Sequence, residues 1–271
     1  MTDKQAALSL RGITLGYGGG ADICRDISLE VPRGSFTVIL GPNACGKSTV
    51  LKAMARLLSP RAGEILLEGR ELAKWPTGEL ARHLGLLPQS AIAPDGIRVV
   101  DLVARGRSPH QGIFSRWSAE DERVVAEVME TAGVLDLSQR VVQELSGGQR
   151  QRVWLALLLA QQTDVLLLDE PTTFLDIAHQ YSLLNLSDRL RREGGRTVVA
   201  VLHDLNQACR YATHLIVMKD GRVVAAGDPA EVMNAELVKD VYQLPCDVIP
   251  DPQTGTPMVV PHAQVHPAAV V

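Results

Sequence analysis

The 271-residue chain lacks features that several classes of protein require. Its four cysteines are scattered, without a CxxC pair, which predicts reduced thiols rather than a disulfide framework. The formal net charge is -4, so no basic field attracts nucleic acid. No apolar run approaches the roughly 18 residues that a membrane-spanning helix needs. The first residues also lack the pattern of a secretory signal, so we expect a cytosolic chain that reaches a membrane only by docking to another subunit.

The composition is that of a globular protein, with 46% hydrophobic residues, 21% charged residues and only 4% aromatic ones. The length fits one domain, or one domain with a subdomain, and we find no internal repeat. Residues 8–40 alternate apolar and polar positions as half-buried strands do, whereas residues 95–160 have a helical period. We therefore expect a β-rich start and a helical middle.

Buried strands that alternate with helices surround that helical middle. We expect strands at 35–40, 165–168 and 197–202, and helices at 48–58 and 177–192. This alternation is typical of a doubly wound α/β fold with a parallel sheet, here interrupted by a helical insertion. The prolines from Pro245 onwards predict a C-terminal tail, and we expect its last ten or so residues to lack fixed structure.

The first chemical signal is a glycine-rich loop between a predicted strand and a predicted helix. It fits the pattern GxxxxGK[ST] and consists of Gly41, Pro42, Asn43, Ala44, Cys45, Gly46, Lys47, Ser48 and Thr49. Backbone N–H groups of such a loop can wrap phosphates at a helix N-terminus. Lys47 would reach the β- and γ-phosphates, and the Ser48 hydroxyl would bind Mg²⁺. The simpler alternative is a turn that caps a helix.

The second signal is a pair of acids at the end of a buried strand, Asp169 and Glu170. Folds of the α/β class present ligand-binding groups at the carboxyl ends of their strands. Asp169 would hold Mg²⁺, directly or through water, and Glu170 would orient and polarise the attacking water. The alternative is that two acids simply begin a loop, which the presence of Lys47 in the same chain argues against.

The third signal is the pentapeptide Leu145-Ser146-Gly147-Gly148-Gln149, which precedes an apolar helical run. If it begins that helix, the Ser146 hydroxyl and the following N–H groups can grip a γ-phosphate. The alternative, an N-cap followed by a tight turn, is physically the same structure. Function would need a second molecule, because a pentapeptide at the tip of the helical insertion should not reach the chain's own Lys47.

The loop, the pentapeptide and the acid pair, in this order, resemble the ATP-binding cassette (ABC) family over about residues 8–260. The resemblance implies an α/β fold: a RecA-like P-loop NTPase core with an N-terminal antiparallel β subdomain and a helical insertion. It also implies an ATPase that uses ATP and Mg²⁺. One cassette would span 8–245, with the nucleotide-binding core at 8–90 and 162–230, the helical signature subdomain at 91–161 and a tail at 246–271.

The resemblance implies roles for further residues. It places His203 at the γ-phosphate as a catalytic group, and Gln89 where it senses both Mg²⁺ and the membrane partner. It places Tyr17 against the adenine ring. Asp176 matches a loop that crosses between two cassettes, although Thr-Phe-Leu-Asp here replaces the family's Ser-Ala-Leu-Asp. Two copies would pair head to tail and hold each ATP between the loop of one and the pentapeptide of the other.

Two residues of the glycine-rich loop need a separate interpretation. Ala44 stands where many cassettes have glycine, which we expect to be tolerable because a negative φ there would accommodate its methyl group. Cys45 is interpreted as filler, and a redox role is the alternative.

Three segments resemble one branch of the family, the ferric-siderophore importer ATPases. They are 105–111 with Phe114, Trp117, Glu120 and Asp121; 173–180; and 202–208. This resemblance implies permease subunits in the membrane and, indirectly, a substrate-binding protein as partners, with the chain peripheral on the cytoplasmic face. Segment 105–121 and the groove near Gln89 are expected to dock a permease helix through a surface that includes Arg107.

Other functions stay open at this point. Cobalamin or haem import is an alternative, because the cargo would never touch this subunit. A soluble ABC ATPase acting on ribosomes or DNA is another, although a single cassette, the lack of a long coiled-coil insertion and the acidic net charge argue against it. An exporter subunit is a third, against which the siderophore-like segments argue.

Overall fold

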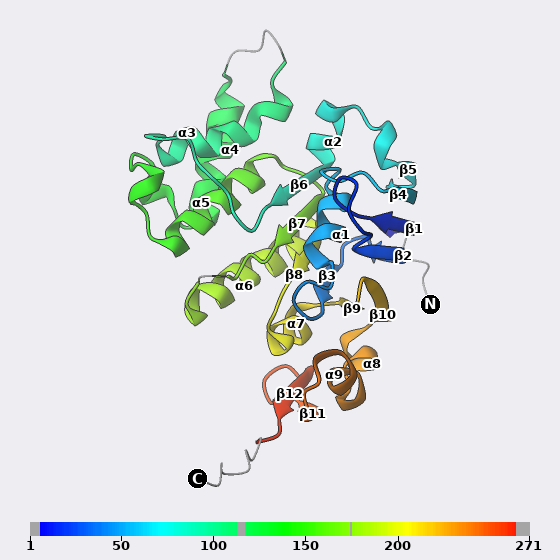
Figure 1. The fold of residues 1–271 in the computed structure, drawn as a ribbon. Helices are drawn as coiled ribbons and strands as arrows, with labels where there is room; N and C mark the ends of the chain where they lie inside the picture. The colour runs from blue at the N-terminus through cyan, green and yellow to red at the C-terminus, as the bar shows by residue number, and fades with distance from the viewer. Residues whose placement is uncertain (1–5, 113–116, 174, 264–271) are drawn as a thin grey trace, which may run out of the picture.

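The computed structural model describes residues 6–112, 117–173 and 175–263, and Figure 1 shows their arrangement. The interpretations that involve Phe114, Phe174 and residues 264–271 lie outside the described residues. The strands are β1 Ala6–Leu15, β2 Cys24–Pro32, β3 Phe36–Leu40, β4 Ala62–Leu67, β5 Arg70–Glu71, β6 Leu84–Leu87, β7 Val165–Asp169, β8 Thr197–Val201, β9 His214–Lys219, β10 Arg222–Gly227, β11 Cys246–Pro250 and β12 Pro257–Pro261. The α-helices are α1 Lys47–Met54, α2 Thr77–His83, α3 Val99–Ala104, α4 Ala119–Thr131, α5 Gly147–Ala160, α6 Ile177–Gly194, α7 Leu205–Tyr211, α8 Pro229–Val232 and α9 Ala235–Tyr242.

The central sheet has the predicted parallel core. In the described part of the chain its order is β10-β9-β3-β8-β7-β6, and only β10 is antiparallel to its neighbour. Every residue of β3, β7 and β8 is buried, because layers cover both faces of the sheet. Val165 and Leu167 pack on the face that α1 covers, whereas Leu166 and Leu168 pack with α5, α6 and α7. The carboxyl ends of β3, β6, β7 and β8 therefore meet at one edge.

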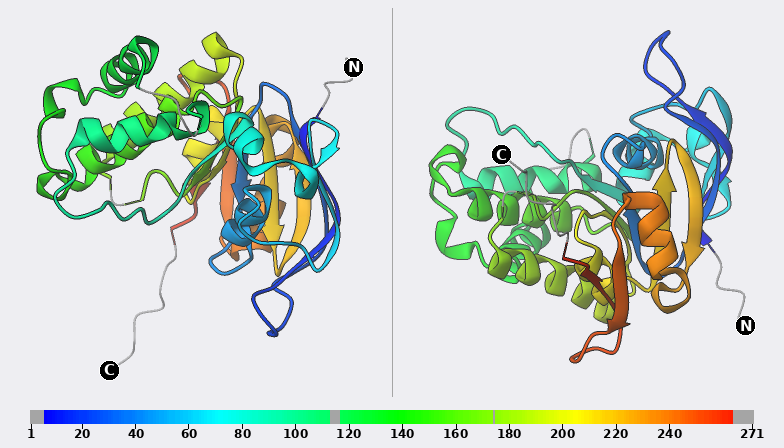
Figure 2. Two further views of the ribbon diagram at one scale, coloured as in Figure 1. Left: turned by 90° about the horizontal axis from the view of Figure 1, so that it is seen from above. Right: turned by 60° about the horizontal axis from the view of Figure 1, so that its bottom comes forward.

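A second sheet lies on the α1 side and is antiparallel throughout. Its order is β2-β1-β4-β5 within the described residues. Apolar residues of β1 and β2, such as Leu10 and Ile27, share one core with Leu51 and Met54 of α1. Figure 2 shows this sheet on one side of the central sheet and the helical region on the other. The predicted N-terminal β subdomain is thus confirmed.

The helical region has a core of its own. Side chains of α3, α4 and α5 pack there, including Leu102, Val125, Met129 and Val153. Ser118 caps α4, because its Oγ accepts a hydrogen bond from the Asp121 backbone N–H and its own N–H donates to the Asp121 carboxylate. The predicted helical insertion is therefore a packed unit between β6 and β7.

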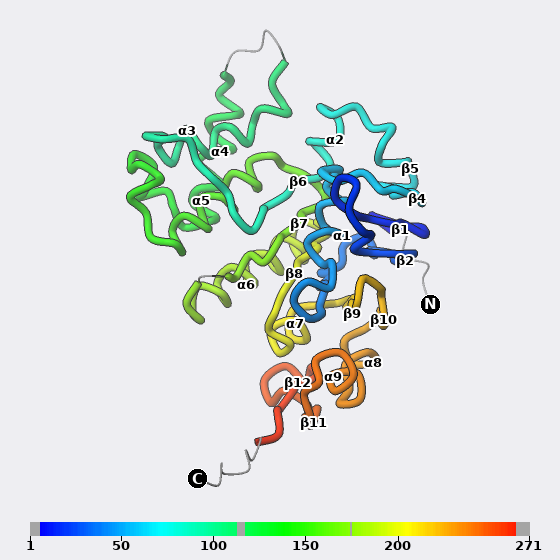
Figure 3. The backbone as a smooth tube through the Cα atoms, viewed as in Figure 1, coloured from blue at the N-terminus to red at the C-terminus, as the bar shows by residue number. Residues whose placement is uncertain are grey.

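Two segments differ from the expectation. Helix α1 ends at Met54 rather than at residue 58, and Arg56 follows with a φ of 57°. In the segment interpreted as a tail, β11 and β12 form an antiparallel hairpin, whose course Figure 3 shows. The prolines do not prevent this pairing because Pro250, Pro257 and Pro261 all lie at strand ends. Asn206 of α7 holds the hairpin through the backbone N–H and C=O of Val259.

Candidate active site

The glycine-rich loop joins β3 to α1, and two of its glycines have no room for a side chain. Gly41 has a φ of 149°, and a Cβ there would lie 2.2 Å from the backbone oxygen of Met218. Gly46 has a φ of 104°, and a Cβ there would lie 2.4 Å from Cys24 Sγ. The loop is therefore pressed against β9 and β2, and its conformation depends on both glycines.

The expectation for Ala44 is wrong. Its φ is 62°, in the left-handed region, where a Cβ costs about 1–2 kcal/mol. Alanine is present at this position although glycine would be free of that cost. The surrounding loop holds the strained conformation, as is common at functional sites.

Lys47 and Ser48 begin α1, and their polar groups bond different partners. Lys47 is only 5% exposed, and its Nζ donates to the carbonyl oxygens of Gly41 at 2.9 Å and Pro42 at 2.8 Å. Ser48 Oγ donates to Asp169 Oδ1 at 2.7 Å and so ties α1 to the end of β7. Burial raises the pKa of Asp169, while the Ser48 hydrogen bond opposes that shift.

Glu170 is the centre of a hydrogen-bonded cluster. Its Oε2 accepts from Gln89 Nε2 at 2.6 Å and from Thr173 Oγ1 at 3.2 Å, and His203 Nε2 lies 2.8 Å from its Oε1. Gln89 follows β6 and His203 follows β8, so three strand ends converge on one carboxylate. Sequence reasoning did not find Thr173, whose role depends on the turn in which its N–H bonds the Glu170 carbonyl.

A cavity of about 390 Å³ lies beside this cluster. Its lining consists of Ile23, Asn43, Ala44, Gly46, Lys47, Ser48, Thr49 and Glu170. Of this lining, Ile23 was not predicted from the sequence, because a single isoleucine after a turn carries no signal of such a position. Tyr17 is 48% exposed in the turn between β1 and β2 and does not belong to this lining, so its contact with adenine stays a prediction.

The pentapeptide and Asp176 lie away from that cavity lining. Ser146 caps α5 in a capping box, in which its Oγ accepts from the Gln149 N–H and its own N–H donates to Gln149 Oε1. Ser146 and Gly147 are exposed. Asp176 caps α6 and also bonds His179 Nδ1 at 2.7 Å. Its backbone bond with His179 lowers the pKa of the carboxyl, so it carries a negative charge at neutral pH.

Cys45 has the environment of an inert thiol. It is buried, and burial raises the pKa of its thiol. Cys24, which lies next to Gly46, has its pKa raised to about 11 by burial and by the nearby Cys45. A thiol that stays protonated is a poor nucleophile and a poor redox sensor, so the interpretation as filler fits the environment better.

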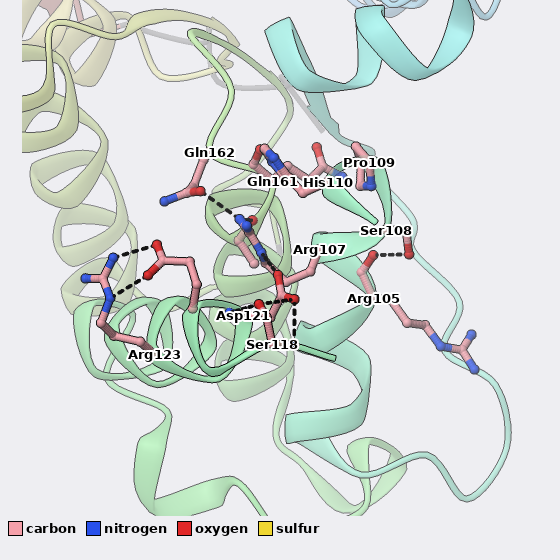
Figure 4. A network of polar contacts seen from close by, with 12 residues as sticks. Arg105, Arg107, Ser108, Pro109, His110, Ser118, Asp121, Arg123, Gln161 and Gln162 are labelled. Carbon is pink, nitrogen blue, oxygen red and sulfur yellow. Dashed lines mark hydrogen bonds and ion pairs between the residues drawn. The ribbon is translucent and has the colours of Figure 1, made fainter. Parts of the chain in front are cut away.

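Arg107 is not the exposed residue that the sequence interpretation requires. It is 4% exposed; its Nε donates to Asp121 Oδ1 at 2.9 Å and its Nη1 donates to the Ala160 carbonyl and Gln162 Oε1 (Figure 4). Gly106, which directly precedes Arg107, has no room for a side chain, because a Cβ there would lie 2.3 Å from the Leu157 backbone oxygen. Arg107 therefore fastens α5 to α4 within the helical region and offers no docking surface.

The groups at this site that could bind a metal ion are oxygen donors. No trio of histidine, cysteine or acidic side chains with metal-binding placement occurs among residues 6–112, 117–173 and 175–263. Ser48 Oγ and Asp169 Oδ1 are already neighbours, and Mg²⁺ typically takes one or two carboxylates together with phosphate oxygens and waters. The residues present fit that ion when phosphates accompany it.

The comparisons with known proteins agree with this geometry. The family described as "ABC transporter" matches residues 24–173, more than half of the chain. The chain therefore belongs to the ABC transporter family, as an ATP-binding cassette that hydrolyses ATP. It is 50% identical to the ferric enterobactin transport ATP-binding protein FepC of Escherichia coli over 268 residues, which cover 99% of this chain and 98% of that protein.

Two further matches extend the comparison. The chain is 46% identical to the achromobactin transport ATP-binding protein CbrD of Dickeya dadantii, covering 96% of this chain and 97% of that one. The cassette MJ0796, solved as a dimer in a post-hydrolysis state with ADP and Pi, superimposes with a TM-score of 0.73 at 27% identity, covering 82% of this chain and 98% of that one. Within the described residues, no helix is both long enough and apolar enough to span a membrane.

Proposed function

We propose that this chain powers the uptake of ferric siderophores across the cytoplasmic membrane, as the ATP-hydrolysing subunit of an importer. The observation that carries the hydrolytic part is the meeting of Lys47, Ser48 and Glu170 at one cavity. The cargo is inferred from the 50% identity with a ferric enterobactin transport subunit.

Each group around the cavity has a distinct task in hydrolysis. The loop N–H groups and the Lys47 ammonium would bind the β- and γ-phosphates, with Lys47 exchanging the Gly41 and Pro42 carbonyls for phosphate oxygens. Glu170 would orient the attacking water and accept its proton, and His203 would contact the γ-phosphate. Gln89 bonds Glu170 directly, so a movement of the segment after β6 would displace the catalytic carboxylate.

Mg²⁺, held by Ser48, Asp169 and Gln89, would neutralise charge on the phosphates when bound. The short contact between Ser48 and Asp169 supports this assignment, because two oxygens at 2.7 Å can turn to one cation.

The second half of the site would come from another copy of this chain. Ser146 and Gly147 are exposed at the start of a helix, where N–H groups attract anions, yet they do not line the cavity. A head-to-tail dimer brings them over the phosphates of the partner, and the likeness to the dimeric cassette MJ0796 supports that pairing. Asp176, exposed and charged, would lie at the same interface.

The permease would dock on the 97–138 region, but not at Arg107, which is buried. A groove of about 490 Å³ between α3 and α4 includes Val125 and Met129, and it is bordered by Trp117 and Leu135, which are 47% and 46% exposed. Among the residues that the structure describes, the charged ones in its lining are Asp101 and Glu122, both acidic. We therefore assign it a basic, amphipathic cytoplasmic helix of the permease, which would hold the chain on the inner face of the membrane.

Uptake measurements test this function. Cells that lack the gene should fail to accumulate one or more labelled ferric siderophores from a panel, while ferrous iron still restores growth. Trp117→Glu should abolish uptake and spare ATP hydrolysis by the isolated chain, whereas Leu57→Glu, at a 68% exposed leucine elsewhere, should affect neither. If siderophore uptake is normal and cobalamin or haem uptake is lost, the cargo is cobalamin or haem instead. Co-purification with ribosomes or DNA would contradict the role as an importer subunit.

A further inference from the structure

Two of the segments that resemble siderophore importers, 173–180 and 202–208, meet in the structure through a pair of glutamines. Neither glutamine lines the cavity, and the proposed hydrolysis mechanism uses neither. Gln180 belongs to the first turn of α6, and Gln207 belongs to α7, which begins two residues after His203. Their side chains connect the elements that carry Asp176 and His203.

Gln180 holds the loop that precedes Asp176. Its Nε2 donates to the carbonyl oxygens of Thr172 at 3.3 Å and Leu175 at 3.0 Å. Two carbonyl acceptors require the NH₂ end of the amide, so the orientation of this side chain is determined by its partners. Its Oε1 must then point away from the loop.

Gln207 supplies the donor for that oxygen. Its Nε2 donates to Gln180 Oε1 at 2.7 Å, and the residue is only 5% exposed. Its backbone N–H also donates to Asp204 Oδ1 at 2.8 Å, which fixes the start of α7 next to His203. Because Gln207 bonds both Asp204 and Gln180, a displacement of the segment that carries His203 would be transmitted to Gln180.

The contacts close into a ring that includes the Glu170 carboxylate. Glu170 contacts His203 on one side and Thr173 on the other. From His203 the chain leads through Asp204, Gln207 and Gln180 back to the Thr172 carbonyl. Every link is 3.3 Å or shorter, so the loop and the His203 segment cannot move independently without breaking a hydrogen bond.

We propose that Gln180 and Gln207 are positioning residues that couple the His203 segment to the Asp176 loop, and through it to the second copy of the chain. The proposal rests on the proposed dimer. In that dimer the state of the γ-phosphate at His203 would set the position of the loop facing the partner, so the two ATP sites would act cooperatively.

Substitutions by methionine, which keeps side-chain length and removes the amide, test the pair in the full-length chain. Gln180→Met and Gln207→Met should each lower kcat about tenfold, because small misplacements at a reacting centre are costly. The Hill coefficient for ATP should fall toward 1, while the Kd for ATP stays within about twofold of wild type. The double variant should match Gln180→Met alone, because Gln207 acts through Gln180.

Tyr211→Phe is the matched control. Tyr211 Oη donates to Asn185 Oδ1 at 2.8 Å, so it links the same two helices without reaching the loop. It should leave kcat and the Hill coefficient unchanged, and thermal denaturation should show all variants folded. Gln207→Glu is a second variant that keeps the size: its carboxylate would repel Gln180 Oε1, so it too should lower the Hill coefficient.

Three results would overturn the proposal. Unchanged kcat and Hill coefficient in both methionine variants would do so, as would additive losses in the double variant or an equal loss in Tyr211→Phe. If the wild-type Hill coefficient is nevertheless above 1, the proposed dimer would still stand although the coupling through the glutamines would not. A wild-type Hill coefficient of 1 would contradict the cooperativity and the coupling with it, whereas a chain that stays monomeric in saturating ATP would contradict the dimer itself.

Discussion

Two carboxylates of this chain, Glu170 and Asp121, each accept several hydrogen bonds, yet their surroundings differ. Asp121 is bound by buried Arg107 and by Ser118, all within one compact helical region. Glu170 is bound by Gln89, Thr173 and the half-exposed His203, from separate strand ends beside a cavity. The first arrangement is a closed structural ion pair, whereas the second can exchange its partners for substrate. The number of bonds therefore does not distinguish the two carboxylates, but the exposure of their partners and the elements that carry those partners do.

The largest effect should follow from changing Glu170. We expect Glu170→Gln to lower kcat by at least about a hundredfold, because water orientation and proton acceptance are lost while the loop still binds ATP. The variant should accumulate as an ATP-bound dimer, measurable by light scattering. Glu193→Gln, at an exposed position on α6, serves as the control. A monomeric Glu170→Gln protein in saturating ATP would count against the shared site.

Arg107→Glu should instead act on stability. Leaving two buried carboxylates without a cation should lower the free energy of unfolding by about 3–5 kcal/mol, measured by urea denaturation. Arg123→Glu is the matched control, because Arg123 pairs with Glu120 and Glu127 at the surface of α4 and should barely move the midpoint. Equal shifts in the two variants would contradict the contrast between a buried and an exposed ion pair.

The ion pair between Arg107 and Asp121 should also affect how the free energy of unfolding changes at acid pH. The hydrogen bond from Arg107 lowers the pKa of Asp121 to about 2 from 3.8, with help from Ser118. A depressed folded-state pKa stabilises the fold above the unfolded value and loses that contribution as pH falls from about 4 through 2. In urea melts between these pH values, Asp121→Asn should therefore show a flatter decline than wild type. A parallel decline would mean that the pair does not contribute.

The smallest expected effect belongs to Ala44→Gly. Glycine relieves the positive φ but adds entropy to the unfolded chain, so the net gain should be about 1 kcal/mol or less. ATP hydrolysis should stay at the wild-type rate, because the loop N–H groups keep their places. A clear loss of activity would show that the alanine methyl, which lines the cavity, helps to hold the nucleotide.

The sequence was sufficient for features whose residues are neighbours in the chain. The loop 41–49, the acid pair after β7 and the pentapeptide each have a local spacing that predicts their structure, and the alternation of strands and helices predicts the sheet. The family resemblance, rather than any pattern of their own, assigned Gln89 to Mg²⁺ and the membrane partner and His203 to the γ-phosphate, and the structure adds that both contact Glu170.

Features that depend on distant partners could not be predicted. The sequence suggests that Arg107 lies on the surface, whereas in the structure it is bonded to Asp121, Ala160 and Gln162. Ala44 has a positive φ because its loop is pressed against other strands, and no local signal reveals that. Gln180 and Gln207 lie 27 positions apart, and only the packing of α6 beside α7 makes them partners.

The central claim is that the site around Glu170 is completed by the pentapeptide of a second copy, and mixing two inactive variants tests it most directly. Lys47→Ala would remove the phosphate ligand of one half-site, and Ser146→Arg would block the partner's phosphate pocket. Each variant alone should be inactive, whereas their mixture should regain ATP hydrolysis, because a heterodimer contains one intact loop facing one intact pentapeptide. Absence of any recovery in heterodimers demonstrated by a tag on each variant would contradict the account.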